Sequence, residues 1–105
     1  MKVRLRTYAF IFATALFAAL AFEPARAETL AQGQAAYGHH DYRGAYSQWL
    51  VLAEKGNARA ENNLGLLYQK GQGVKRSYAM AMRWYRKAAA QGNAEAENNI
   101  GALYD

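Results

Sequence analysis

Apolar residues recur with helical spacing along most of the chain. They follow i, i+4, i+7 and i+8, or close variants, which place them on one face of a helix with 3.6 residues per turn. The three sets are Ala45, Trp49, Leu52 and Ala53; Ala60, Leu64, Leu67 and Tyr68; and Tyr78, Ala81, Met82, Tyr85, Ala88 and Ala89. The pattern predicts helices over about 42–55, 58–70 and 78–91. It also predicts an earlier helix over 28–37 and a last one from residue 94 onward.

Capping residues stand at the ends of these predicted helices. Asp41, Asn57, Ser77 and Asn93 each precede a helix, where a side-chain oxygen can accept from an unpaired backbone N–H. Glycines follow two of the helices, at Gly56 and Gly92, where a left-handed residue is needed. The boundaries therefore agree with the apolar pattern.

The sequence repeats itself at a fixed interval. Gly56–Tyr68 and Gly92–Tyr104 align over thirteen positions without a gap, at an offset of 36 residues (92 − 56). Tyr42–Gly56 matches Tyr78–Gly92 more weakly at the same offset. A fixed period of this size indicates stacked helical hairpins. We expect one diverged hairpin, one complete hairpin and half of a third.

Glycine stands inside a predicted helix at the same phase of two repeats, as Gly65 and Gly101. An interior helical glycine costs about 1 kcal/mol relative to alanine. Its presence predicts that a neighbouring helix passes too close for a Cβ atom. Simple copying of the repeat would also place glycine at both positions.

The repeated residues resemble the Sel-1-like repeat, a relative of the tetratricopeptide repeat. They are Ala60, Leu64, Gly65, Tyr68, Gly71, Gly73 and Val74, followed by Ala81, Trp84, Tyr85, Lys87, Ala88, Ala89 and Gly92. Ser77 stands where the family usually has Asp. The resemblance implies an all-α, right-handed α-α superhelix (solenoid) of helix-turn-helix repeats. It also implies a protein that binds other proteins, often in bacterial envelopes or secretion pathways.

Residues 1–27 have the layout of a secretory signal peptide. A basic start precedes the uncharged, mostly apolar run Tyr8–Phe22, and Ala25-Arg26-Ala27 is a small-x-small cleavage site. The rival interpretation is a membrane anchor, but a helix over this run spans only about 22 Å of a hydrocarbon core about 30 Å thick. We expect cleavage after Ala27, a periplasmic or secreted protein, and a repeat domain over 28–105.

The net charge and the residue types present argue against several classes of function. The chain carries +5, but residues 1–27 hold four of its 13 Lys and Arg and one of its 8 Asp and Glu, which leaves +2 for the remainder. That value argues against a nucleic-acid partner. The chain has no Cys, so a disulfide framework is excluded. His39 and His40 lack further ligands for a metal. We expect no cofactor, no metal site and no catalytic residue.

One basic cluster stands out in the second half of the chain, formed by Lys75, Arg76, Arg83, Arg86 and Lys87. Such a cluster is more often a solvated helix face than a binding site. An anionic polymer is the alternative partner. Nearby glutamates, Glu54, Glu61, Glu95 and Glu97, favour the solvated face.

The sequence thus predicts an exported helical-repeat scaffold or adaptor that binds a protein or peptide in the bacterial envelope. The expected contact residues are Asn62, Leu66, Gln69, Asn98, Ala102 and Leu103. A periplasmic regulator of a membrane sensor kinase is the first alternative. An enzyme, such as the β-lactam hydrolases proposed among cysteine-rich relatives, is the second and lacks the cysteines. We expect membrane contact only during export.

The last predicted helix carries apolar residues on more than one side, including Ile100, Leu103 and Tyr104. Exposed apolar surface of this kind marks a site of self-association or partner binding. The alternative is that this helix itself caps the array, with Glu95, Asn98 and Asn99 facing water. Both interpretations stay open at the level of sequence.

Overall fold

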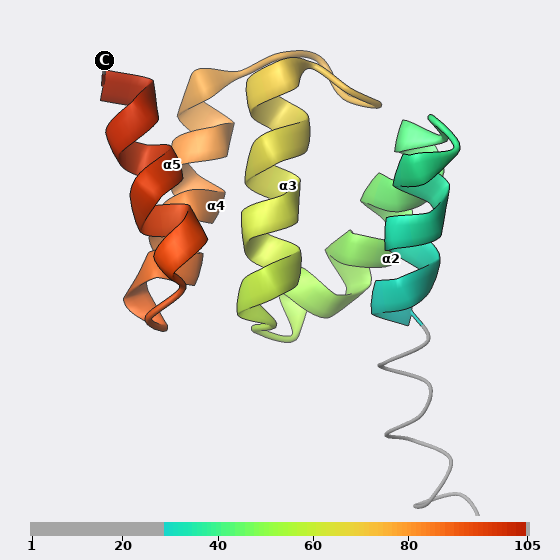
Figure 1. Ribbon diagram of the computed structural model, residues 1–105, viewed down its shortest axis with the longest axis horizontal. Helices are drawn as coiled ribbons and strands as arrows, with labels where there is room; N and C mark the ends of the chain where they lie inside the picture. Colours follow the sequence, from blue (N-terminus) through green and yellow to red (C-terminus); the bar gives the residue numbers. More distant parts are fainter. Residues whose placement is uncertain (1–28, 105) are drawn as a thin grey trace, which may run out of the picture.

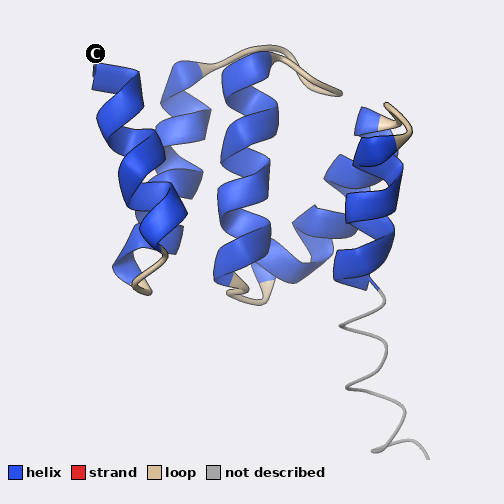
Figure 2. Ribbon diagram, viewed as in Figure 1, coloured by secondary structure: helices blue, strands red, loops and turns tan. Residues whose placement is uncertain are grey.

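The computed structural model describes residues 29–104 of the chain. This part is helical, with short turns and no strand (Figure 2). Residues 29–38 form a first helical segment. The remaining helices are α2 (Tyr42–Glu54), α3 (Ala58–Lys70), α4 (Tyr78–Ala90) and α5 (Ala94–Tyr104). All five lie within about one residue of the predicted ranges, apart from the open end of the last.

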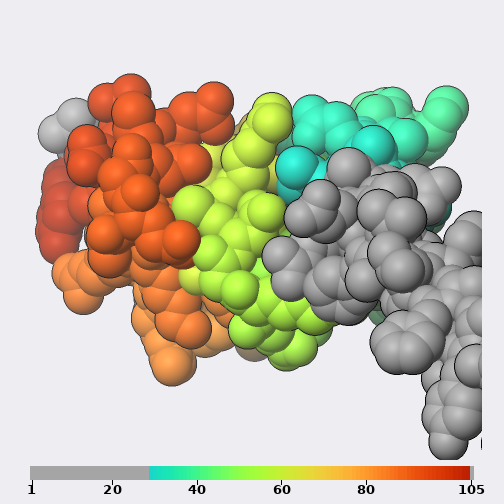
Figure 3. All heavy atoms as spheres, turned by 90° about the horizontal axis from the view of Figure 1, so that it is seen from below, coloured from blue at the N-terminus to red at the C-terminus, as the bar shows by residue number. Residues whose placement is uncertain are grey.

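The helices stack in sequence order, as a solenoid does. α3 packs against both α2 and α4, and α4 packs against α5. In Figure 1 the segment 29–38, α3 and α5 lie toward the viewer, and α4 lies behind α3 and α5. The space-filling view shows the same order, with the orange residues of α4 and α5 beside the yellow-green residues of α3 (Figure 3). The predicted all-α solenoid of helix-turn-helix units is confirmed.

Each predicted N-cap is formed. The capping oxygens accept backbone N–H groups of Gly44, Ala60, Met80 and Ala96, at 2.8–3.1 Å, from Asp41, Asn57, Ser77 and Asn93 respectively. Each such cap stabilises a helix by about 1 kcal/mol. Gly56 and Gly92 have φ of 86° and 85°, so the predicted left-handed helix ends are confirmed.

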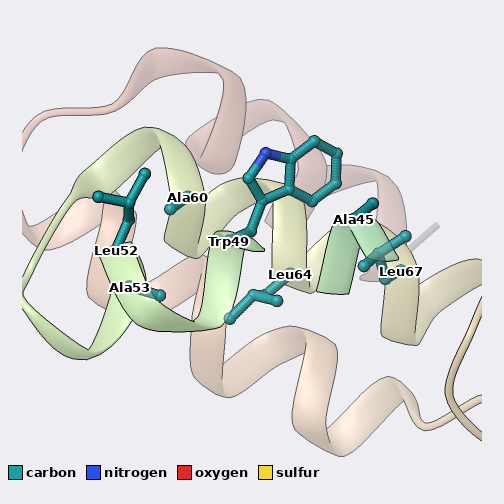
Figure 4. Close-up of a cluster of buried hydrophobic side chains, with 7 residues drawn as sticks. All are labelled: Ala45, Trp49, Leu52, Ala53, Ala60, Leu64 and Leu67. Atoms are coloured by element: carbon teal, nitrogen blue, oxygen red, sulfur yellow. The ribbon is translucent and has the colours of Figure 1, made fainter. Parts of the chain in front are cut away.

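The first hairpin and α3 enclose one apolar core, shown in Figure 4. Its buried residues are Ala45, Trp49, Leu52, Ala53, Ala60, Leu64 and Leu67. These are the predicted apolar residues of two helices, except for Tyr68, which is half-buried. The Trp49 indole nitrogen is buried without a hydrogen-bond partner in the described part of the chain. Aromatic packing must therefore outweigh the cost of that unpaired N–H.

A second apolar core lies between α3, α4 and α5, built on Ala81, Tyr85, Ala88 and Ala96. Tyr85 is 0% exposed, as predicted. The prediction that Tyr78 joins this stripe is wrong, because its side chain is 54% exposed. It is the first residue of α4, and it packs beneath the Arg76 guanidinium, which lies 5.3 Å from the ring centroid.

Two glycines receive an aromatic ring from the second helix of their own hairpin. A Cβ on Gly65 would lie no farther than 3.0 Å from three ring carbons of Tyr85. A Cβ on Gly33 would lie no farther than 2.9 Å from three atoms of the Trp49 indole. The predicted close approach at Gly65 is confirmed, and the sequence analysis did not identify its counterpart at Gly33. At Gly101 the same prediction is wrong, because nothing lies within 4 Å of the Cβ position.

The predicted signal peptide, residues 1–27, lies outside the described residues. Within residues 29–104, none of the helices combines the length and apolar character needed to cross a bilayer.

Candidate functional site

The first helix of each unit presents a stripe of exposed and half-buried residues on the same side. On α3 the stripe is Arg59, Asn63, Leu66 and Lys70, spaced by four, three and four residues. Its counterparts on α5, 36 residues later, are Glu95, Asn99 and Ala102. We call these residues, together with those of the hollow described next, the first-helix face. The stripe lies about a quarter turn from the apolar residues Ala60, Leu64 and Leu67, because α3 packs against α2 on one side and α4 on the other.

A hollow of about 410 Å³ lies where the segment 29–38 meets α3. It is lined by Leu30, Ala31, Gln34 and Arg59. Two apolar side chains thus adjoin an amide and an exposed guanidinium. This combination suits a peptide that offers one apolar side chain and one carboxylate or carbonyl oxygen.

Asn62 does not lie on this face, contrary to the sequence expectation. Its side chain is 1% exposed and is used inside the fold. The Asn62 amide nitrogen donates to Glu95 at 3.2 Å, and its oxygen accepts from the Asn99 amide at 3.0 Å. A partner on the first-helix face therefore cannot reach it. Asn62 instead joins α3 to α5.

Gln69 also turns inward. Its side-chain oxygen accepts a hydrogen bond of 2.5 Å from the Tyr85 hydroxyl, and the residue is half-buried. Leu66 is half-buried on the first-helix face and packs in part against the second core. Asn98 and Ala102 are exposed on α5, while Leu103 is half-buried against the second core. The structure thus leaves Leu66, Asn98 and Ala102 as the predicted contact residues open to a partner.

A buried acid, Glu61, joins α3 to the residue that ends α4. Glu61 is 4% exposed, and its carboxylate accepts a hydrogen bond of 2.6 Å from the Gln91 amide. Burial raises the pKa of Glu61, and both the Gln91 bond and the nearby Lys87 charge partly oppose that rise. These polar contacts fix the angle between neighbouring units, so the first-helix face is held rigid from behind.

Hydrogen bonding and burial also hold Tyr68 and Tyr85 in place. The hydroxyls of Tyr46 and Tyr68 share a hydrogen bond of 3.2 Å, and this bond together with burial raises the pKa of Tyr68 to about 12. Burial also raises the pKa of Tyr85 to about 12. Both tyrosines are thus neutral packing residues at physiological pH.

No metal-ligand cluster forms in the described part of the chain. Within residues 29–104, no group of three His, Cys, Asp or Glu could hold a metal ion. His39 and His40 are exposed in the turn before α2. The Nδ1 atom of His40 lies 2.8 Å from the Tyr42 hydroxyl, so this histidine fastens the turn.

A comparison with family models identifies the central hairpin. The model described as Sel1 repeat matches residues 58–93. The chain carries a Sel1 repeat. The predicted resemblance is confirmed, and the matched residues coincide with α3, the following loop and α4.

A solved structure is similar to more of the chain than the matched repeat. It is the crystal structure of a Sel1 repeat protein from Oxalobacter formigenes, 38% identical, with a TM-score of 0.61. The similarity covers 71% of this chain and 34% of that one, so the chain spans about a third of its length. No curated protein matches the sequence. Sel1 repeats are generally protein-interaction modules and not catalysts.

Sequence reasoning missed the polar part of the face, namely Gln34, Arg59, Asn63 and Glu95. A signal for three of them was present. Arg59 and Asn63 lie beside the apolar stripe of the Sel1 repeat and four residues apart, and Glu95 repeats Arg59 at the 36-residue offset. Gln34 had no such signal, because the first hairpin diverges from the repeat.

Proposed function

We propose that this protein is an exported scaffold or adaptor of the bacterial envelope, which holds a protein or peptide partner on its first-helix face. The observation that carries the proposal is the stripe itself. Exposed or half-buried side chains recur at the 36-residue offset on α3 and α5, beside a hollow lined by Arg59 and Gln34. Behind them, Asn62 and Glu61 hold the helices in place.

The chemistry of the face indicates the kind of segment it would bind. Apolar contacts come from Leu30, Leu66 and Ala102, while Arg59 and Glu95 offer opposite charges on neighbouring helices. An extended segment laid across the helices could pair an acidic group with Arg59 and a basic group with Glu95. Preformed rigid faces of this kind lose little entropy on binding.

A pair of equal substitutions tests this proposal. Ala102→Glu places a charge on the first-helix face, whereas Ala90→Glu places the same charge on α4, and both alanines are exposed. Purified variants are used to capture protein from an envelope extract. The proposal requires that Ala102→Glu loses a partner that the parent chain and Ala90→Glu both retain. Equal capture by all three chains would contradict it.

Export is a separate part of the proposal, supported by the basic start, the apolar run and Ala25-Arg26-Ala27. Mass spectrometry of the protein from cell fractions should find Glu28 as the first residue in the periplasm or medium. Recovery of the uncleaved chain in the membrane fraction would show an anchor instead.

Self-association through α5 is supported by a comparison of two equivalent helices. Glu61, Asn62 and Gly65 are buried in α3, whereas their counterparts Glu97, Asn98 and Gly101 are exposed in α5. A second copy could cover this side of α5. Sedimentation of the parent chain and of Gly101→Glu should then show a dimer only for the parent. Leu103 is unsuitable for this test, because it packs in the second core.

A further inference from the structure

Charge is distributed very unevenly along the described chain. Residues 62–94 contain six lysines and arginines and not one aspartate or glutamate. This stretch covers most of α3, the loop that follows and all of α4. All six are exposed. Lys70 belongs to the first-helix face, and we call the other five the basic face: Lys75, Arg76, Arg83, Arg86 and Lys87.

Three cations of the basic face lie on one side of α4, and Lys75 and Arg76 stand in the loop just before it. Arg86 and Lys87 follow Arg83 by three and four residues, so the three share one side of the helix. The buried residues Ala81, Tyr85 and Ala88 occupy the opposite side, against α3 and α5. In Figure 1, α4 lies behind these two helices, so the cations face away from the first-helix face.

Three of these cations have an aromatic partner. The Lys87 ammonium lies 4.8 Å from the Trp84 ring centroid, and Arg86 donates to the Tyr104 hydroxyl at 3.3 Å. Arg76 covers the exposed ring of Tyr78. Lys87 also lies near the buried Glu61, and its charge acts to lower the pKa of that carboxyl. Cation–π contacts orient a charge without neutralising it.

The shape of this surface discriminates between partners. A single helix of the outer layer is convex, so it does not enclose an extended chain as the hollow beside Arg59 can. Lipid headgroups diffuse within a leaflet and can gather beneath irregularly spaced cations. Tyrosine is enriched at membrane interfaces, where its ring and hydroxyl suit the headgroup level. The exposed Tyr78 fits that role.

We propose that the basic face of α4 binds anionic phospholipid headgroups, with the helix lying along the membrane surface. This contact is additional to any passage through the membrane during export. The first-helix face would then point away from the bilayer, toward the aqueous phase. Binding is electrostatic, so salt weakens it within the range of the Debye length.

The test measures binding of the full chain to vesicles of mixed phosphatidylglycerol and phosphatidylcholine, with pure phosphatidylcholine vesicles alongside. The variant Arg83→Gln/Arg86→Gln removes two cations from the basic face. The matched control is Gln32→Glu/Ala35→Glu, which changes the net charge equally, with the same three-residue spacing, at exposed positions of the segment 29–38. All three chains retain residues 1–27, so any contribution of that segment is common to them.

Each cation near an anionic leaflet contributes about 1 kcal/mol, or about fivefold in affinity. The basic-face variant should therefore bind the anionic vesicles about 25-fold more weakly than the parent chain. The control should bind nearly as the parent does, and high salt should release the parent. If circular dichroism shows that the double variant is unfolded, Ala79→Glu replaces it, because that carboxylate pairs with Arg83 one turn later.

Three results would overturn the proposal. The first is equal weakening in the variant and the control, which would mean that net charge governs binding. The second is equal binding of the parent to anionic and neutral vesicles. The third is binding to polyglutamate or duplex DNA without binding to anionic vesicles, which would assign the face to another polyanion.

Discussion

At the scale of single residues, the contact between Gly65 and Tyr85 joins the two helices of the Sel1 repeat. The ring is fully buried against the glycine backbone, and its hydroxyl donates to Gln69 on the same helix as Gly65. The glycine thus gives up helix propensity of about 1 kcal/mol to admit a large apolar surface. Gly101 occupies the same phase but has no neighbour within 4 Å.

Alanine at these two glycines should have opposite effects. Gly65→Ala must displace the Tyr85 ring, and overpacking of this kind costs about 1–3 kcal/mol, which exceeds the gain in helix propensity. Gly101→Ala meets open space, so it should gain a few tenths to about 1 kcal/mol. Thermal or urea unfolding of both variants measures the difference. Stabilisation by both alanines would show that the ring is not seated at Gly65.

The burial of Tyr85 also predicts that the free energy of unfolding falls at alkaline pH. Burial raises the pKa of Tyr85 from 10.0 to about 12, so the folded state favours the neutral phenol. The contribution of Tyr85 to the free energy of unfolding is therefore complete below pH 10 and is lost as the pH rises toward 12. Urea unfolding across this range should show a shallower loss for Tyr85→Phe than for the parent chain. Tyr78→Phe, at an exposed tyrosine, should follow the parent.

At the scale of elements, Asn62 connects the first helices of two successive units. Asn62→Asp would place a carboxylate against Glu95 in a site that is 1% exposed, and it would remove the amide that donates to Glu95. We expect a loss of about 1–3 kcal/mol in the free energy of unfolding. Asn98→Asp makes the same change at the equivalent exposed position of α5 and should be nearly neutral. Equal melting temperatures of the two variants would contradict the role assigned to Asn62.

The elements themselves follow from local signals in the sequence. The four caps and the two glycine helix ends depend on a few neighbouring residues, so pattern alone predicted them. The burial of Asn62 and Gln69 depends on which helix lies across from them, and the 3.6-residue period does not contain that information. The burial predicted for Tyr78 was wrong for a related reason, because a residue at the first position of a helix can extend beyond the packed interface.

The first-helix face was only partly predictable, because the helical period does not show which helices lie beside a residue. Leu66 and Ala102 were found because they lie on first helices, where the resemblance placed the contacts. Arg59 and Asn63 belong to the same stripe but became clear only once α3 was placed against α2 and α4. Gly33 was hidden because the first hairpin departs from the repeat. Its fit to Trp49 appears only in three dimensions.

At the scale of the whole molecule, the two layers of helices separate two proposed surfaces. The first-helix face carries mixed charges and a hollow beside Arg59, whereas α4 carries cations alone on its outer side. A partner bound on one layer would leave the other free. The protein would then hold its partner close to an anionic membrane surface without spanning the bilayer.

Site-specific photocrosslinking tests the central claim, that a partner binds the first-helix face, most directly. A photoreactive residue at Ala102 or Arg59 reports on that face, and one at Ala90 reports on α4; all three positions are exposed. The account predicts a discrete protein adduct of one size from Ala102 and Arg59, and no such adduct from Ala90. A protein adduct formed only from Ala90, or equally from all three positions, would contradict it.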